Sequence, residues 1–141
     1  MQKKIDTHYL VKCNEALKRA NAMLQNYSQE DIEYEIYRSA VVKEFEILLE
    51  QSAKLLKKVL RAYFHSNKEV DRLTFKDIFR HTGLHGLLEL QEVERWLQYR
   101  DNRNNTAHDY GVEFADNTLV LIDDFIQDVD KIIKVIDDFE G

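Results

Sequence analysis

The residues best suited to chemistry in this sequence lie close together between positions 103 and 110. Arg103, His108 and Tyr110 follow the spacing Arg-x4-His-x-Tyr, and Asn104 comes directly after the arginine. A guanidinium stays charged and can hold a phosphate through two hydrogen bonds. An imidazole, with an ordinary pKa of about 6.5, exchanges protons at neutral pH. Together they could cleave RNA without a metal ion: His108 would move the proton of the 2′-hydroxyl or the leaving group, and Arg103 would stabilise charge on the phosphate.

A purely structural interpretation of the same residues is also open. Arg103 would then pair with Asp101 or Asp109 at the surface, and His108 would donate a hydrogen bond across a helix junction. Short motifs of common residues do recur by chance. The position between two helical segments favours a functional role, because residues carried by a connection can point into a cleft.

Other kinds of site find little support in the sequence. His81 and His85 have the i, i+4 spacing of a metal pair, but Gly83 lies between them and no acidic residue completes the pattern. Cys13 is the single cysteine and is expected to be a small buried apolar side chain. The chain has no glycine-rich phosphate loop and no Gly-Ser or Asp-x-Asp nucleotidyltransferase site. We therefore expect no metal, no cofactor and no nucleotidyl transfer by this chain itself.

Composition predicts an all-α protein. The 141 residues are 44% hydrophobic and 33% charged, with four glycines and no proline, so long helices are uninterrupted and hairpin turns are scarce. We expect a single domain over residues 1–141. The net charge of −6 argues against a protein that coats nucleic acid, so any RNA contact must be local.

The same features predict a cytoplasmic protein. A lone cysteine fits a reducing compartment, and the basic residues at the start are not followed by the apolar run of a secretion signal. No segment approaches the roughly 20 apolar residues that span a bilayer, so no membrane contact is expected.

Hydrophobic periodicity predicts two helices in the first half of the chain. Apolar steps of three and four residues indicate a helix over about residues 6–26. Ser28 and Asp31 resemble a capping box, so a second helix should begin there and run to about Phe64, a length of roughly 45 to 50 Å. This helix would be the spine of the fold. Its basic residues are expected to form a solvated face: Lys54, Lys57, Lys58 and Arg61.

The second half predicts three further helices. Residues 65–72 are expected to be a polar connection, followed by a short helix that Thr74 and Asp77 begin and Gly83 ends as its C-cap. An apolar run over residues 84–97 predicts a helix that ends near Arg100. A last, strongly amphipathic helix is expected from Asn117 to about residue 139. Four long helices and one short one assemble most simply as an up-and-down four-helix bundle with an additional short helix.

The motif resembles the signature of the HEPN superfamily, and in particular its small single-domain members encoded beside a minimal nucleotidyltransferase (MNT). Arg103, His108 and Tyr110 match the pattern, and Asn104 is the polar residue that many members carry after the arginine. The segment SAVVKEFE at residues 39–46 also resembles these proteins. Chain length, helical content and the motif's place before the last helix agree, so the expected fold is HEPN-like.

The resemblance implies a homodimer whose two motifs face each other to form one RNA-cleaving cleft. Arg103 and His108 would be catalytic, Asn104 would support them, and the RNA target would be tRNA or mRNA. It also implies a toxin that an MNT antitoxin holds in check by transferring AMP to Tyr110. Such a modification would place bulk and negative charge beside His108 and oppose the RNA phosphate.

Two other functions stay open. The chain could be a non-catalytic subunit that presents substrate to an MNT nucleotidyltransferase, or a plain interaction bundle. A neighbouring MNT reading frame would support the toxin and the substrate-presenting subunit over the plain bundle.

Overall fold

The computed structural model describes residues 4–105 and 112–139, and all regular structure in these residues is helical. This confirms the all-α fold class. The elements in chain order are α1 (His8–Leu24), α2 (Ile32–Leu60), the 3-10 turn η1 (Arg61–Tyr63), α3 (Asn67–Asp71), α4 (Phe75–Leu84), α5 (Leu90–Asn105) and α6 (Val112–Asp138).

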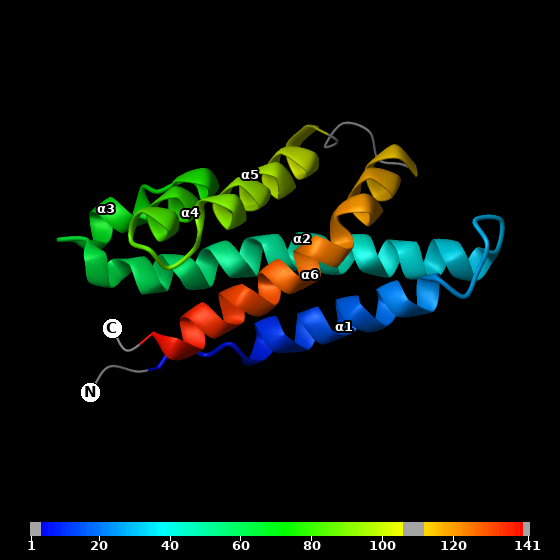
Figure 1. Ribbon diagram of the computed structural model, residues 1–141, viewed down its shortest axis with the longest axis horizontal. Coiled ribbons are helices and arrows are strands. Elements are labelled where there is room, and N and C mark those ends of the chain that lie inside the picture. The colour runs from blue at the N-terminus through cyan, green and yellow to red at the C-terminus, as the bar shows by residue number, and fades with distance from the viewer. Residues whose placement is uncertain (1–3, 106–111, 140–141) are drawn as a thin grey trace.

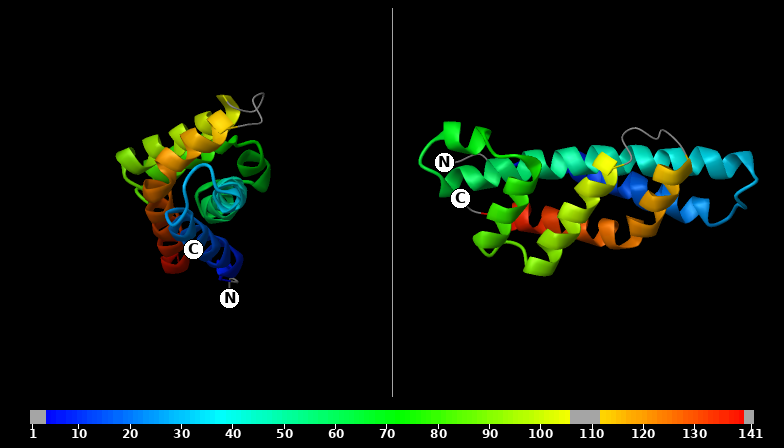
Figure 2. Two further views of the ribbon diagram at one scale, coloured as in Figure 1. Left: turned by 90° about the vertical axis from the view of Figure 1, so that its right-hand side faces the viewer. Right: turned by 90° about the horizontal axis from the view of Figure 1, so that it is seen from above.

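The helix α2 is the spine of the bundle, as its length predicts. It runs the length of the molecule, with α1 and α6 along one side and α4 and α5 along the other (Figure 1). Helices α1, α2, α5 and α6 alternate in direction, which gives the expected up-and-down bundle. The end-on view shows the other helices gathered around α2 (Figure 2). Its buried side chains recur every three or four residues, because one stripe faces each neighbour: Val41, Phe45, Leu48, Leu49, Leu55, Leu56 and Val59.

Aromatic rings join the helices at the centre of the core. Phe125 of α6 lies with its ring centroid 4.7 Å from Phe45 of α2 and 4.9 Å from Tyr99 of α5. Trp96 stacks on Phe79 of α4 at 4.7 Å. All five side chains are essentially buried. Burying such rings contributes about 1.5 to 3 kcal/mol each, so this cluster fixes α5, and with it Arg103, against the rest of the bundle.

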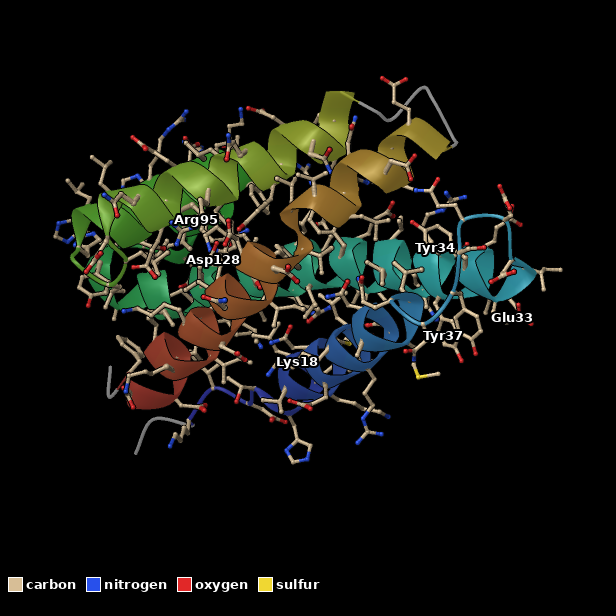
Figure 3. The ribbon with its side chains drawn as sticks, turned by 45° about the vertical axis from the view of Figure 1, so that its right-hand side comes forward. Lys18, Glu33, Tyr34, Tyr37, Arg95 and Asp128 are labelled. Atoms are coloured by element: carbon tan, nitrogen blue, oxygen red, sulfur yellow. The ribbon has the colours of Figure 1, made fainter. Side chains whose placement is uncertain are left out.

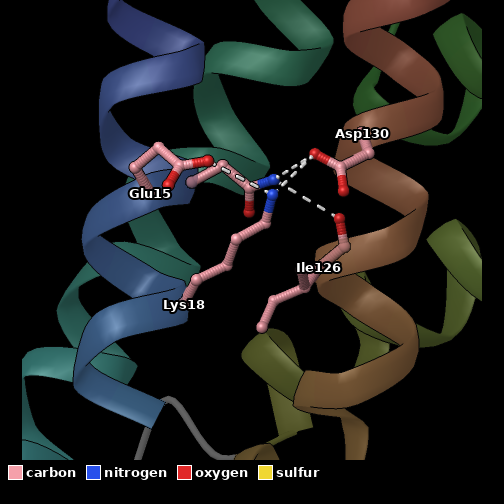
Figure 4. Close-up of polar contacts among 5 residues, drawn as sticks. Glu15, Lys18, Ile126 and Asp130 are labelled. Carbon is pink, nitrogen blue, oxygen red and sulfur yellow. Dashed lines mark hydrogen bonds and ion pairs between the residues drawn. The ribbon is translucent and has the colours of Figure 1, made fainter. Parts of the chain in front are cut away.

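Polar contacts hold α1 against α6. Asn14 donates from Nδ2 to Asp130 Oδ1 at 2.9 Å and to the Ile126 carbonyl at 3.4 Å. Lys18 lies 3.3 Å from Asp130 and also 3.3 Å from Glu15 (Figure 4). The exposed ion pairs contribute little, whereas the buried Asn14 amide fixes the register of the two helices.

Glycine and threonine determine the ends of α4. The Thr74 hydroxyl accepts from the Asp77 N–H and the Asp77 carboxylate accepts from the Thr74 N–H, so a capping box begins the helix where these two residues predicted its start. Gly83 as the C-cap is wrong, because it lies inside α4. The C-cap is His85, and Gly86 follows it as the left-handed residue: its φ is +77°, and the Leu87 N–H donates to the Thr82 carbonyl, as in a Schellman motif.

Gly83 has a different reason to be glycine. A Cβ there would lie 2.7 Å from Val93 Cγ2, so the missing side chain allows α4 and α5 to approach closely.

Two other helix starts differ from the sequence prediction. Ser28 is not an N-cap: Asp31 holds that position for α2, and its carboxylate accepts from the Ser28 N–H at 3.0 Å. The polar connection predicted for residues 65–72 is also wrong in part, because it contains α3. The Ser66 hydroxyl accepts from the Glu69 N–H and caps that short helix.

The helices that flank the motif have different bounds from those predicted: α5 starts six residues after the predicted start at residue 84, because Leu84 still belongs to α4, and α6 starts earlier than predicted. Helix α5 begins at Leu90 and continues to Asn105 rather than ending near Arg100. Leu84 is the last residue of α4, and Leu84 and Leu90 are 76% and 73% exposed. Helix α6 begins at Val112, five residues before the predicted cap Asn117. The α5 extension is entirely polar, so hydrophobic periodicity could not reveal it, whereas the α6 extension contains Val112, Phe114 and Ala115.

In the ranges that the structure covers, no helix has the length and apolar composition that crossing a membrane requires.

Candidate functional site

The last turns of α5 carry the first two residues of the motif. Arg103 and Asn104 lie on the helix itself and not in the connection where the sequence suggested them. The buried face of α5 comprises Val93, Trp96 and Tyr99, which leaves Arg103 half-buried and Asn104 exposed. The arginine is therefore attached to rigid secondary structure.

Two ion pairs connect this side of α5 to α2. Arg100 Nη1 lies 2.9 Å from Glu50 Oε1, and Arg103 Nε lies 3.7 Å from Glu46 Oε1. The arginines are one helical turn apart on α5, and the glutamates are one turn apart on α2, so the pairs form two parallel rungs. Glu46 thus places a carboxylate beside the Arg103 side chain from outside the motif.

The Arg103 pair is loose. Both side chains are 39% exposed, and 3.7 Å is longer than a direct hydrogen bond. Pairs of this kind contribute at most about 1 kcal/mol, because water screens them. Glu46 can orient the guanidinium without competing strongly against a phosphate.

The purely structural interpretation paired Arg103 with Asp101 or Asp109 at the surface, and the pairing with Asp101 is wrong. Among the described residues Arg103 pairs with Glu46, and the Asp101 carboxylate instead accepts from Lys76 Nζ at 2.6 Å. Asp109 lies outside the described residues.

A hydrogen-bonded relay fastens the end of α5 to the start of α6. Asn102 Nδ2 donates to Thr118 Oγ1 at 3.0 Å, and that hydroxyl donates to the Phe114 carbonyl at 2.8 Å. Thr118 is fully buried. The relay therefore joins α5 to α6, and the rest of the motif lies between these two helices in the sequence.

His108 and Tyr110 lie outside the described residues. The structure therefore positions Arg103 and Asn104 of the predicted site and leaves the roles of His108 as proton carrier and Tyr110 as modification site as predictions.

Sequence reasoning missed the residues that support Arg103. Glu46 ends the segment at 39–46 that resembles the HEPN proteins, yet no role follows from its type alone. The sequence did carry one signal for the ion pairs: Glu46 and Glu50 lie one helical turn apart, and so do Arg100 and Arg103. Asn102 and Thr118 gave no such signal.

The basic group on α2 contributes to the fold. Lys57 Nζ and Arg61 Nη2 lie 3.7 and 3.2 Å from Asp71 Oδ1, so both pair with the end of α3. Lys54 and Lys58 are exposed. This agrees with the solvated face predicted for the group.

A third arginine of α5 makes a polar cluster with α6 around the buried Asp128. Arg95 donates to both carboxylate oxygens of Asp128, from Nε at 2.8 Å and from Nη2 at 2.7 Å, and the Tyr99 hydroxyl donates to the same carboxylate. Figure 3 shows Arg95 and Asp128 facing each other between the two helices. Burial, followed by the hydrogen bond to Asp128, raises the pKa of Tyr99. The cluster satisfies its own hydrogen bonds and serves packing.

The histidine pair and the cysteine are parts of the packing. The His81 ring meets Phe64 edge-on at 5.1 Å and His85 stacks on Tyr63 at 4.1 Å. Within residues 4–105 and 112–139, no three or more His, Cys, Asp or Glu side chains are arranged to hold a metal ion. Cys13 is buried as predicted, and burial raises the pKa of its thiol.

The comparison with models of protein families shows the family to which the chain belongs. Residues 11–138 match the model described as nucleotidyltransferase substrate binding protein like, which is most of the chain. The chain belongs to this family. The resemblance to the small HEPN partners of nucleotidyltransferases, drawn from the motif and residues 39–46, is thereby confirmed.

Among curated proteins, the chain is similar to the probable ribonuclease HepT of Haemophilus influenzae. The two are 33% identical over 88 residues, which are 62% of this chain and 59% of that protein. The match thus spans about three fifths of the length of that relative.

Two solved structures share the fold of this family member. One is a Haemophilus influenzae protein whose structure is described as the fold of a substrate binding domain of a nucleotidyltransferase; its TM-score is 0.77 at 23% identity, over 93% of this chain and 98% of that one. The other, a protein of Thermus thermophilus, has a TM-score of 0.65 at 20% identity, over 88% of this chain and 98% of that one. At these identities the likeness concerns the fold alone.

Proposed function

We propose that this family member is a metal-independent endoribonuclease, the toxin of an HEPN/MNT pair. The observation that carries the proposal is the half-exposed Arg103 guanidinium, held on the last turns of α5 and directed by Glu46, in a chain similar to a probable ribonuclease. An arginine on a rigid helix can meet a phosphate without much reorganisation.

In the proposed reaction the 2′-hydroxyl of RNA attacks the adjacent phosphorus. His108 accepts the hydroxyl proton, the bond from phosphorus to the 5′-oxygen breaks, and that oxygen takes a proton from water as it leaves. The products are a 2′,3′-cyclic phosphate and a 5′-hydroxyl. Arg103 stabilises the negative charge that builds on the non-bridging oxygens, and Asn104, exposed beside it, supports the phosphate by hydrogen bonding.

The proposed active form is a homodimer with both motifs at the interface. The protein carries a net charge of −6, and one arginine and one histidine offer few contacts to RNA. Two copies around a two-fold axis double those contacts and concentrate positive charge locally. Light scattering at micromolar concentration should give twice the mass of the chain, and a monomer at that concentration would contradict the dimer.

The test of catalysis uses labelled tRNA and total RNA in the presence of EDTA. The parent protein should cut RNA and leave cyclic phosphate ends, whereas Arg103→Ala and His108→Ala should lose activity by a factor of about 100 or more. Arg100→Ala is the matched control, because Arg100 lies one turn back on α5 and makes the same kind of ion pair with Glu50. Cleavage that survives both motif substitutions would refute the assignment.

The second candidate is a non-catalytic subunit that presents substrate to an MNT nucleotidyltransferase. The family description favours it directly. A purified MNT partner whose nucleotidyl transfer to a separate acceptor depends on this chain, combined with no RNA cleavage by the chain alone, would establish this role instead.

A further inference from the structure

Apolar side chains lie on the solvent side of α1, on the flank that faces away from α6. Leu17 is buried in the core, and the amides of Asn14 and Asn21 donate to Asp130 and Asp123 of α6. Tyr9 and Met23 are 52% and 37% exposed. Because a spacing of seven residues returns to nearly the same side of a helix, three residues form one stripe on the opposite flank: Tyr9, Ala16 and Met23.

Helix α2 carries a second apolar stripe on its solvent side. Phe45 is buried in the core, while Arg38 and Glu46 face Asp116 of α6 and Arg103 of α5. Spacings of four and seven residues leave one further stripe, away from the core and from both of these helices: Ile36, Ala40 and Ile47. Ile36 is 59% exposed, and the other two are half-buried.

The two stripes adjoin, because α1 and α2 run side by side (Figure 1). The pKa of Tyr9 is raised first by its hydrogen bond to the Cys13 thiol and also by the Glu44 carboxylate of α2, so the tyrosine lies on the flank of α1 next to α2. Single exposed apolar residues are common, but two adjoining stripes on neighbouring helices are typical of an interaction site. We call these six residues the outer face.

Basic residues flank the outer face. Lys12 and Arg19 each lie one helical turn from Ala16, and Lys43 lies one turn from Ala40. All three are exposed and make no ion pair with any residue that the structure describes. Their charges are therefore available to a partner.

Acidic neighbours reduce this positive charge only in part. The Oε2 atom of Glu44 is buried, and Glu50 pairs with Arg100 on the side of α5. Glu33 is exposed, one turn before Ile36 at the end of the outer face. The flanks are therefore locally positive in a protein whose net charge is −6.

We propose that the outer face binds an amphipathic helix of a partner protein whose apolar stripe is flanked by Asp or Glu. Tyr9 and Met23 are roughly 21 Å apart along α1, which is the length of a helix of about four turns. The small side chains of Ala16 and Ala40 lie midway, so the backbone of that helix can approach closely. Carboxylates on its flanks would meet Lys12, Arg19 and Lys43.

Charge and chemistry disfavour two other occupants. A second copy of this chain would place one set of basic flanks against another, with a net charge of −6 on each copy. RNA would gain little from Ile36, Met23 and Ile47, because aliphatic side chains offer it neither charge nor a stacking surface. The proposal does not depend on the cleavage proposed for Arg103 and His108.

Fluorescence anisotropy with two synthetic peptides tests the outer face on the full chain. Each peptide has about 20 residues, an Ala-rich background and Leu at helical spacing, with Glu on the flanks of one and Lys on the flanks of the other. The Glu peptide should bind at least about tenfold more tightly than the Lys peptide, and its binding should weaken as salt is raised. Ile36→Ser and Lys43→Gln should each weaken it by about fivefold or more.

Matched substitutions elsewhere on the surface serve as controls. Val120→Ser changes an aliphatic residue of α6 that is 83% exposed, and Lys68→Gln changes an exposed lysine of α3. Both variants should bind the Glu peptide within about twofold of the parent. Circular dichroism confirms that each variant is folded.

Four results would overturn the proposal. The first is no binding of the Glu peptide at about 1 mM protein, and the second is equal binding of the two peptides or binding that neither Ile36→Ser nor Lys43→Gln changes. The third is a lower mass of Ile36→Ser than of the parent in sedimentation velocity, which would assign the outer face to a second copy. The fourth is binding of labelled pentaadenylate by His108→Ala protein that Lys43→Gln weakens, without binding of the Glu peptide, which would assign it to RNA.

Discussion

The Arg103 guanidinium of α5 lies 3.7 Å from the Glu46 carboxylate of α2, and both side chains are 39% exposed. A carboxylate at this distance lowers the local positive potential that would attract RNA, while it also favours guanidinium conformations that point toward α2. The balance between these two effects can be measured.

We expect Glu46→Gln to tighten RNA binding about two- to fivefold in a His108→Ala background. The substitution removes a competing negative charge and keeps the shape and hydrogen-bonding capacity of the side chain. Fluorescence anisotropy with a labelled RNA measures the change, and it should shrink as salt is raised. Glu50→Gln, one turn along α2 beside Arg100, is the control and should have less effect. Weaker RNA binding by Glu46→Gln would mean that orientation matters more than charge.

Stability at high pH should report the buried cluster around Asp128. The pKa of Tyr99 is raised in the folded protein by burial and by its hydrogen bond to Asp128. Below about pH 10 the folded and unfolded states both keep the phenol proton, so the stabilisation is complete there. Above that pH only the unfolded tyrosine ionises, and the free energy of unfolding should fall by up to about 1.4 kcal/mol per pH unit.

Urea denaturation of the parent and Tyr99→Phe between about pH 8 and 11 checks this behaviour. The Phe variant should be less stable near pH 8 by about 1 to 2 kcal/mol, because the Asp128 carboxylate loses a buried donor. The difference should narrow above pH 10. A constant difference across the whole range would show that Tyr99 does not titrate differently in the two states.

Gly86→Ala should destabilise the protein by about 1 kcal/mol. Gly86 ends α4 with a φ of +77°, and a Cβ in the left-handed region raises the energy of the folded state even though nothing lies within 4 Å of it. Gly86→Asn should cost less, because asparagine tolerates this conformation better. Thermal unfolding followed by circular dichroism ranks the three proteins, and equal stability of the Ala and Gly proteins would argue against a role for Gly86 in ending α4.

Tyr110→Phe should abolish AMP transfer by an MNT partner and leave the fold unchanged. The substitution keeps the aromatic ring and removes the acceptor oxygen. Incubation of both proteins with the partner and ATP, followed by intact-mass measurement, gives the result. Equal adenylylation of the Phe variant would place the modification on another residue, and no adenylylation of either protein would favour the substrate-presenting role.

Periodicity predicted the fold well where apolar residues face a neighbour. The stripes of α1, α2 and the second half of α6 appear in the structure as buried faces, and Trp96 and Val93 mark the buried side of α5. The method failed where helices leave the core. The end of α5 is polar, and a side-chain hydrogen bond from Asn102 to Thr118, 16 positions later, joins it to α6.

The ends of helices were predictable where a pair of residues at a fixed spacing has a single structural role. Thr74 and Asp77 were placed correctly because a capping box needs both partners at a fixed spacing. Ser66 and Glu69 have the same signature and could have predicted α3. Gly83 and Gly86 could not be told apart by sequence, since one serves close helix packing and the other a left-handed turn.

The candidate site residues could be named from the sequence, but their surroundings could not. The motif identified Arg103 and Asn104, yet both lie on α5 and not in the connection, and the Glu46 carboxylate near Arg103 comes from α2, 57 positions earlier in the chain. Only the packing of α5 against the spine brings Glu46 and Arg103 together, and no local pattern encodes that distance.

Trp96 gives the protein an internal optical reporter. It is the single tryptophan, it is fully buried on α5 seven residues before Arg103, and it stacks on Phe79 of α4. Its indole N–H has no hydrogen-bond partner among the described residues. Emission from such an indole should be at short wavelength and should shift to the red when α5 separates from the core. One emission spectrum can therefore distinguish an α5 variant that is inactive but still packed from one in which α5 has separated from the core.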